Sequence, residues 1–134
     1  MSEWNVGIVD EFRENAGVVG GMFEGKPLLI LHHVGAKSGQ ERVCPLMYQV
    51  TDGGYAVFAS KAGADSHPDW YYNLLANPDA SVEVGTDTVA VSARVLSDDD
   101  RRPIWEQQKS DHPQFADYEA GTDRVIPVLV LETR

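Results

Sequence analysis

The sequence contains little cysteine, few basic residues and no long apolar run. Its single cysteine, Cys44, excludes an internal disulfide and any metal site built from several cysteines. Only 11 lysines and arginines stand against 21 acidic residues, which gives a net charge of −10. Because a phosphate backbone would meet a field of its own sign, non-specific binding to DNA or RNA is disfavoured. The longest apolar run, around Leu28 to Leu31, is far shorter than the ~20 residues that a membrane-spanning helix needs.

The remaining composition is that of one globular domain. A hydrophobic fraction of 43% is enough for a packed core, so we expect a single domain over residues 1–134. The first residues contain neither a basic region nor an apolar stretch, so no signal peptide is expected. With the lone cysteine, this favours a cytoplasmic protein.

Apolar spacing and turn residues predict a helix, three strands, a helix, two strands, a helix and a last strand. The predicted strands are 27–34, 42–50, 55–60, 81–84, 88–96 and 125–131; the predicted helices are 4–16, one beginning at Pro68 and ending at Ala76, and one beginning near 97–100, with a further helical turn at 115–118. Pro45 requires an edge or a bulge. Pro103 predicts that its helix begins late, with Asp100 as the cap, or has an irregular first turn. Because tight turns join most strands, we expect antiparallel pairing and an α+β fold, a small barrel of about six strands.

The segment from Gly35 to Arg42 is a candidate anion site. Glycines allow the backbone N–H groups to face a ligand, Lys37 and Arg42 supply positive charge, and Ser38 supplies a hydroxyl. The spacing of a P-loop is missing, and the same residues also suit an ordinary polar hairpin turn. Two of the few cations nevertheless lie together here.

The segment after Pro68 is a second candidate. A helix that begins there presents unpaired N–H groups, and the aromatic run 70–72 offers flat surfaces for a ring. Trp70 and Leu74, four residues apart, form a core-facing stripe in the alternative interpretation, which the spacing favours for Trp70. His67 is expected to be a cap or turn residue.

Other catalytic patterns are weak. His32 and His33 are adjacent on a predicted strand, so they face opposite sides and cannot share a metal ion. No metal-binding pair spacing and no Gly-x-Ser-x-Gly elbow is present. Cys44 lies in a predicted strand, where an inert buried thiol is expected. Phe115 and Tyr118 share a helical face, where they either cover a pocket or pack at the end of the barrel.

Taken together, several segments resemble one family over nearly the whole chain, the deazaflavin-dependent nitroreductases of actinobacteria. The similar segments are Gly20-Gly21-x-Phe23-x-Gly25-x-Pro27, Val34-Gly35-x-Lys37-Ser38-Gly39, Arg42-Val43-x-Pro45-Leu46, Ser60-Lys61-x-Gly63, His67-Pro68-x-Trp70-Tyr71-x-Asn73-Leu74, Ala76-Asn77-Pro78 and Arg124-x-Ile126-Pro127-Val128. They occur in the family's order with similar gaps.

The resemblance implies a split β-barrel, FMN-binding split-barrel-like, that binds reduced coenzyme F420. It also implies hydride transfer to quinones, nitroimidazoles or electron-poor enones and lactones of the coumarin type. By resemblance, Lys37, Ser38 and Arg42, with Ala36 beside them, hold the coenzyme's phosphate and acidic tail. The other implied cofactor-binding residues are Val43, Cys44, Pro45, Leu46, Met47, Phe58, Ala59, Ser60 and Lys61 around the ring, with Asp69, Trp70, Tyr71, Tyr72, Asn73 and Phe115 closing the site.

The chain departs from the family at several positions, among them His112, which stands in place of an aromatic residue. Ala36 stands where members often have a basic residue, and Phe115 stands where the best-studied branch has a tyrosine. Because position 115 lacks a hydroxyl, Ser60 and Tyr118 become the candidate catalytic residues that stabilise developing negative charge or supply a proton. A small-molecule hydride acceptor is the expected partner, with a homodimer as a further expectation and no stable membrane insertion.

Two other functions stay open at this level. The chain could be a non-catalytic carrier of the deazaflavin, of a flavin or of haem, or a purely structural interaction domain.

Overall fold

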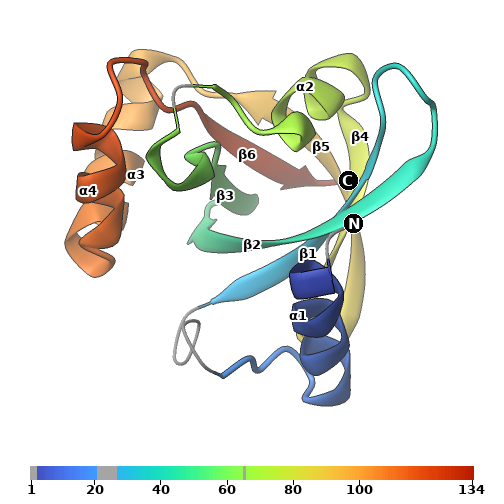
Figure 1. The fold of residues 1–134 in the computed structure, drawn as a ribbon. Coiled ribbons are helices and arrows are strands. Elements are labelled where there is room, and N and C mark those ends of the chain that lie inside the picture. The colour runs from blue at the N-terminus through green and yellow to red at the C-terminus, as the bar shows by residue number, and fades with distance from the viewer. Residues whose placement is uncertain (1–2, 21–26, 65) are drawn as a thin grey trace.

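The computed structural model describes residues 3–20, 27–64 and 66–134 (Figure 1). Gly21, Phe23 and Gly25 of the first similar segment therefore lie outside the described residues. The helices are α1 (Glu3–Glu14), α2 (Asp69–Ala76), α3 (Asp98–Asp111) and α4 (Gln114–Ala120), with a 3₁₀ turn η2 (Lys61–Gly63). The strands are β1 (Leu28–Val34), β2 (Glu41–Thr51), β3 (Gly54–Phe58), β4 (Asp79–Val84), β5 (Asp87–Val95) and β6 (Val128–Thr133). No helix in these ranges is long and apolar enough to span a membrane.

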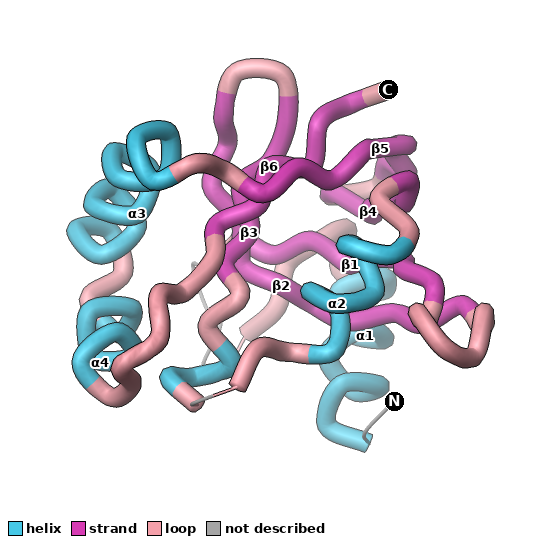
Figure 2. The backbone as a smooth tube through the Cα atoms, turned by 90° about the horizontal axis from the view of Figure 1, so that it is seen from above, coloured by secondary structure: helices cyan, strands magenta, loops and turns pink. Residues whose placement is uncertain are grey.

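The six strands close into an antiparallel barrel in the order β1-β2-β3-β6-β5-β4. β1 completes the closure by pairing with both β2 and β4. Figure 2 shows α3 and α4 together on one side of the barrel, while α2 lies across the other end beside β1 and β2. The predicted α+β barrel is confirmed.

Two apolar clusters explain why β1 and β6 read as continuous hydrophobic runs. Alternate residues of a strand point to opposite faces, and here both faces are covered. Leu29 and Leu31 face the barrel interior with Trp70 and Leu74 of α2, so the predicted core stripe of α2 is confirmed. Leu28 and Ile30 pack in the second cluster, which also contains Ile8, Val9 and Phe12 of α1 and Trp105 of α3.

Among the residues that the structure describes, strand β2 has a stretch along one edge that pairs with no other strand. Its ladder with β1 runs from Glu41 to Met47, but its ladder with β3 contains only Tyr48–Thr51. The Tyr48 N–H donates to the Pro27 carbonyl at 3.3 Å, so even-numbered residues of β2 direct their backbone groups toward β1. Odd-numbered residues, Pro45 among them, direct theirs toward the unpaired edge. The predicted edge position of Pro45 is confirmed, because its missing N–H removes no ladder bond.

Two predicted helix starts are shifted. Pro68 is the residue before α2 rather than its first residue. The third helix does not begin late: Ser97, not Asp100, is its cap, and the Ser97 side chain accepts a hydrogen bond from the Asp100 N–H at 3.4 Å. Pro103 lies inside this helix, which continues through it.

Candidate functional site

Two adjoining hollows lie where β1, β2 and α2 meet. The first has a volume of about 560 Å³ and is lined by His33, Gln40, Glu41, Arg42, Val43, Cys44, Asp69 and Trp70. The second has a volume of about 480 Å³ and is lined by Gly35, Ala36, Lys37, Ser38, Arg42, Asp69, Tyr72 and Asn73. Because Arg42 and Asp69 line both, the two hollows form one groove, called here the β1–α2 groove.

The turn between β1 and β2 forms one wall of this groove. The Gly35 N–H donates to the Gln40 carbonyl at 2.9 Å, and the Gly39 N–H donates to the Gly35 carbonyl at 3.0 Å. A Cβ at position 35 would lie 2.4 Å from the Ser38 hydroxyl oxygen, so only glycine leaves Ser38 where it is. The turn is thus held in one conformation with Lys37 and Ser38 facing the groove.

Asn73 ties this turn to α2. Its Oδ1 accepts from the Ala36 N–H at 2.9 Å, and its Nδ2 donates to His33 Nδ1 at 3.0 Å. Because Nδ1 accepts, the His33 ring is neutral and carries its proton on Nε2, which lies 3.7 Å from Cys44 Sγ. Asn73 is buried, and both its amide oxygen and its amide nitrogen form hydrogen bonds with other groups of the protein.

The groove has mixed charge. Lys37 and Arg42 supply its cations, while Glu41 and Asp69 line it with carboxylates. Burial, and then the charge of Arg42, lower the pKa of His33 to about 4. Burial raises the pKa of the Cys44 thiol to about 12, but Cys44 is only half-buried and lines the first hollow, so the expected full burial is not observed. The positive charge is therefore greatest at the Lys37 end.

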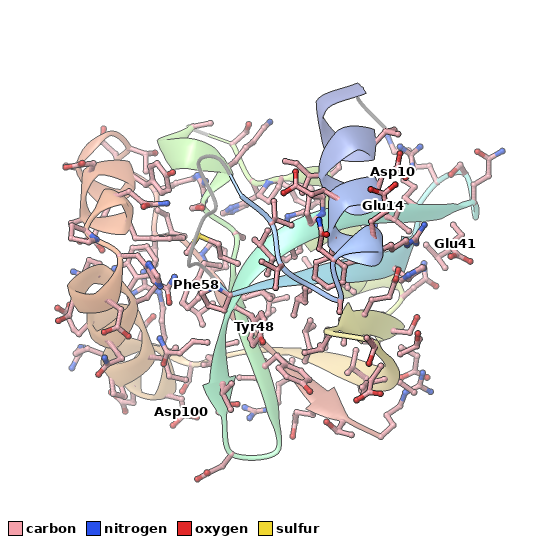
Figure 3. All side chains as sticks on the ribbon, turned by 90° about the horizontal axis from the view of Figure 1, so that it is seen from below. Asp10, Glu14, Glu41, Tyr48, Phe58 and Asp100 are labelled. Carbon is pink, nitrogen blue, oxygen red and sulfur yellow. The ribbon has the colours of Figure 1, made fainter. Side chains whose placement is uncertain are left out.

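A separate aromatic cluster surrounds the end of β3. The Phe58 ring lies 5.6 Å from that of Phe115 and 5.9 Å from that of Trp105, and Phe115 lies 5.2 Å from Tyr118. Phe58 and Phe115 are both buried. In Figure 3, Phe58 lies well away from Glu41, which marks the β1–α2 groove. Phe115 was expected either to cover a pocket or to pack at the end of the barrel, and its buried position in this cluster supports packing.

Ser60 and Tyr118, the predicted catalytic pair, lie on segments that pack together. Ser60 is buried just before η2, and η2 packs against α4, which carries Tyr118. A Cβ at Gly63 would lie only 2.9 Å from the Tyr118 carbonyl oxygen, so the two backbones are in close contact.

The groove thus unites the residues predicted from the turn, all of those predicted from α2 except Tyr71, and Val43 and Cys44. Met47, Phe58, Ala59 and Phe115 are buried in the two apolar clusters, and Leu46 and Tyr71 pack against the interior one. Pro45 is half-buried on the unpaired edge of β2, and Lys61 is exposed on η2. Their ligand contacts stay predictions.

Sequence reasoning missed His33 as part of the site. The sequence places His33 beside the candidate anion loop, but its hydrogen bond to Asn73 joins residues 40 positions apart and could not be inferred from the sequence. The expected opposite placement of the two histidines is consistent with the structure, because His32 instead lies between Glu41 and Glu83. In the described ranges no group of histidine, cysteine and carboxylate side chains is arranged to hold a metal ion.

A family model described as F420H(2)-dependent quinone reductase matches residues 6–133. The chain belongs to this family. The F420H(2)-dependent quinone reductase Rv1261c of Mycobacterium tuberculosis is 35% identical over 127 residues, which are 92% of this chain and 85% of that protein. A solved F420-H2 dependent reductase (FDR-A) is 40% identical with a TM-score of 0.72, over 79% of this chain and 94% of its own. A structure described as a domain-swapped dimer is 36% identical with a TM-score of 0.74, over 95% and 93%.

Membership makes the protein a coenzyme F420-dependent oxidoreductase with the split-barrel fold. The residues of the groove fit this cofactor. The two cations and the hydroxyl at one end suit a phosphate and an acidic tail. At the other end, the unpaired edge of β2 presents the backbone of Val43 beside the first hollow, which suits a flat polar ring.

Proposed function

We propose that this protein uses reduced coenzyme F420 to reduce quinones, and that the β1–α2 groove holds the coenzyme. The observation that supports this best is the gathering of Lys37, Ser38 and Arg42 around one hollow of a protein with a net charge of −10. Since cations are scarce in the chain, their shared position on a groove is most simply explained by an anionic ligand.

In this proposal each part of the groove has a task. Lys37 and Arg42 bind the phosphate and tail by charge-assisted hydrogen bonds. Trp70, with the strand edge of β2, orients the ring. The bound coenzyme supplies a hydride, and the protein supplies placement and polarity. Ser60 and Tyr118 line neither hollow of the groove. They are proposed to act on the acceptor rather than on the coenzyme, by stabilising the negative charge that develops on it and delivering its proton.

The range of acceptors is a further part of the proposal. A quinone is the expected class, and electron-poor enones or coumarin-type lactones place a similar negative charge on oxygen. Nitroimidazoles are included as substrates to be tested, because Phe115 offers no hydroxyl to a nitro group. We further propose that the protein is cytoplasmic and that it forms a homodimer. Size-exclusion chromatography with light scattering tests the homodimer.

The anion site is tested by the double variant K37A/R42A. Titration of coenzyme fluorescence should show affinity reduced by about 100-fold or more, because two charge-assisted contacts are lost. The matched control is R94A/R102A, which removes the same formal charge from β5 and α3 and should bind normally. Unchanged affinity in K37A/R42A would show that the anionic part binds elsewhere.

Catalysis is tested separately by adding reduced coenzyme and menadione and following the absorbance of the oxidised coenzyme. Turnover is the expected result. Binding with no turnover of any acceptor would instead support a carrier, and failure to bind any ring cofactor would support an interaction domain.

A further inference from the structure

Arg124 is the most heavily bonded side chain near the candidate site, and the site as described does not use it. Its guanidinium donates to three backbone carbonyls: Nη1 to Ala59 at 3.1 Å, Nη2 to Ser60 at 2.8 Å and Nε to Ala64 at 2.8 Å. A fourth contact joins Nη1 to His67 Nδ1 at 2.9 Å. One side chain therefore holds both ends of the 59–64 segment and the residue before Pro68.

The partners of Arg124 are unusual for an acidic protein. Within the described ranges, no carboxylate forms an ion pair with it, although the chain has 21 acidic residues. Its planar group of five N–H donors is used to fix carbonyl positions rather than to neutralise charge. Three different nitrogens of the planar fork meet the three carbonyls, whereas a lysine would offer its three donors from one nitrogen, so we expect lysine to reproduce these contacts only in part.

The segment it holds needs such support. Lys61 has a φ of +47° and Gly63 a φ of +82°, and η2 is only three residues long. Left-handed backbone at a residue with a side chain costs about 1–2 kcal/mol and persists where surrounding contacts fix it. Arg124 supplies those contacts from one side, and α4 supplies them from the other by packing on η2.

His67 extends the connection to α2. Because an arginine only donates, His67 Nδ1 must accept, and its ring is neutral. The ring also lies 4.7 Å from that of Tyr71 and 5.9 Å from that of Tyr72. Arg124 thus connects the segment after β3, which contains Ser60, to His67 and through it to the aromatic side chains of α2.

We propose that Arg124 is a positioning residue that fixes Ser60 and the 59–64 segment relative to the start of α2. The catalytic consequence rests on the proposed function, whereas the structural one does not. Because Arg124 acts on the Ser60 end and not on the Lys37 end, its loss impairs turnover more than coenzyme binding.

The test compares R124Q and R124K with R94Q, an exposed arginine whose partner is Glu132. Amide hydrogen exchange needs no coenzyme: Gly63 and Ala64, whose N–H groups bond to Ser60 and Lys61, should exchange about 10-fold faster in R124Q. The kcat for menadione should fall by about 10-fold or more in R124Q, with little change in coenzyme affinity. R124K should give exchange rates and a kcat between those of wild type and R124Q. R94Q should match wild type in exchange rate, kcat and coenzyme affinity.

Three results would overturn the proposal: unchanged exchange in R124Q, an R124K variant equal to wild type, or a loss of affinity as large as the loss of kcat. The second would mean that only the charge of residue 124 matters. The third would mean that Arg124 supports coenzyme binding as much as turnover, either by direct contact or through the 59–64 segment. If R124Q does not fold, R124K carries the test. Should the protein bind no coenzyme at all, the proposed function fails while the exchange result still decides the role of Arg124.

Discussion

At the scale of single residues, the β1–α2 groove depends on a histidine kept neutral. His33 is buried, accepts from Asn73 and has a pKa near 4. Through Asn73 it fixes the Ala36 end of the turn that carries Lys37. Protonation of His33 would remove the acceptor that orients Asn73. The shape of the anion-binding turn is thus coupled to one proton.

This coupling predicts a pH dependence of stability. In the unfolded chain the pKa of His33 is near 6.5, whereas in the folded protein it is about 4. Between pH 6.5 and pH 4 the unfolded state therefore binds more protons than the folded state. The contribution of neutral His33 to the free energy of unfolding is fully present above pH 6.5 and is lost as the pH falls toward 4. The size of this stabilisation is on the order of 2 kcal/mol, which is less than the full pKa difference would give, because the His33 ring borders an open groove.

Urea unfolding at several pH values checks the prediction, with H33Q as the comparison because glutamine keeps an acceptor for Asn73 and does not titrate. H33Q should lose less stability than wild type on acidification. An NMR titration of the His33 ring gives its midpoint directly, and a midpoint near 6.5 would contradict the argument.

At the scale of elements, sequence periodicity predicted every strand and failed mainly at helix starts. β1 and β6 were recognisable because their apolar runs are short and bounded by turn residues. α3 was misplaced because the cost of an internal proline was given too much weight. Three aspartates in the first turn and the Ser97 cap favour an early start.

The importance of that cap can be measured. S97A removes the acceptor for the Asp100 N–H and should destabilise the protein by about 1 kcal/mol. S110A makes the same chemical change on the exposed face of the same helix and should cost little, because alanine favours a helix interior. Equal losses of stability in the two variants, measured by chemical denaturation, would show that Ser97 does not cap α3.

The candidate site was only partly predictable for a related reason. Lys37, Ser38 and Arg42 are local in sequence, so their gathering could be expected from one turn. The bonds of Asn73 to Ala36 and of Arg124 to Ser60 cross 37 and 64 positions. No periodicity or spacing encodes contacts of that kind, since they depend on how the barrel closes.

At the scale of the whole molecule, the proposed ligand and its protein repel each other. A net charge of −10 opposes the approach of a polyanionic coenzyme, while Lys37 and Arg42 attract it only at short range. The Debye length decides which effect dominates at a given distance: it is about 30 Å at 0.01 M salt and about 8 Å at 0.15 M. Screening therefore removes the long-range repulsion before it removes contacts inside the groove.

Stopped-flow fluorescence should accordingly show an association rate constant that rises with salt over this range. The dissociation rate constant should also rise, because the contacts of Lys37 and Arg42 weaken, so the equilibrium affinity changes less than either rate. In K37A/R42A the association rate should still rise with salt, whereas dissociation should become nearly independent of it. An association rate that falls with salt in wild type would mean that the local cations, and not the overall charge, govern the approach of the coenzyme.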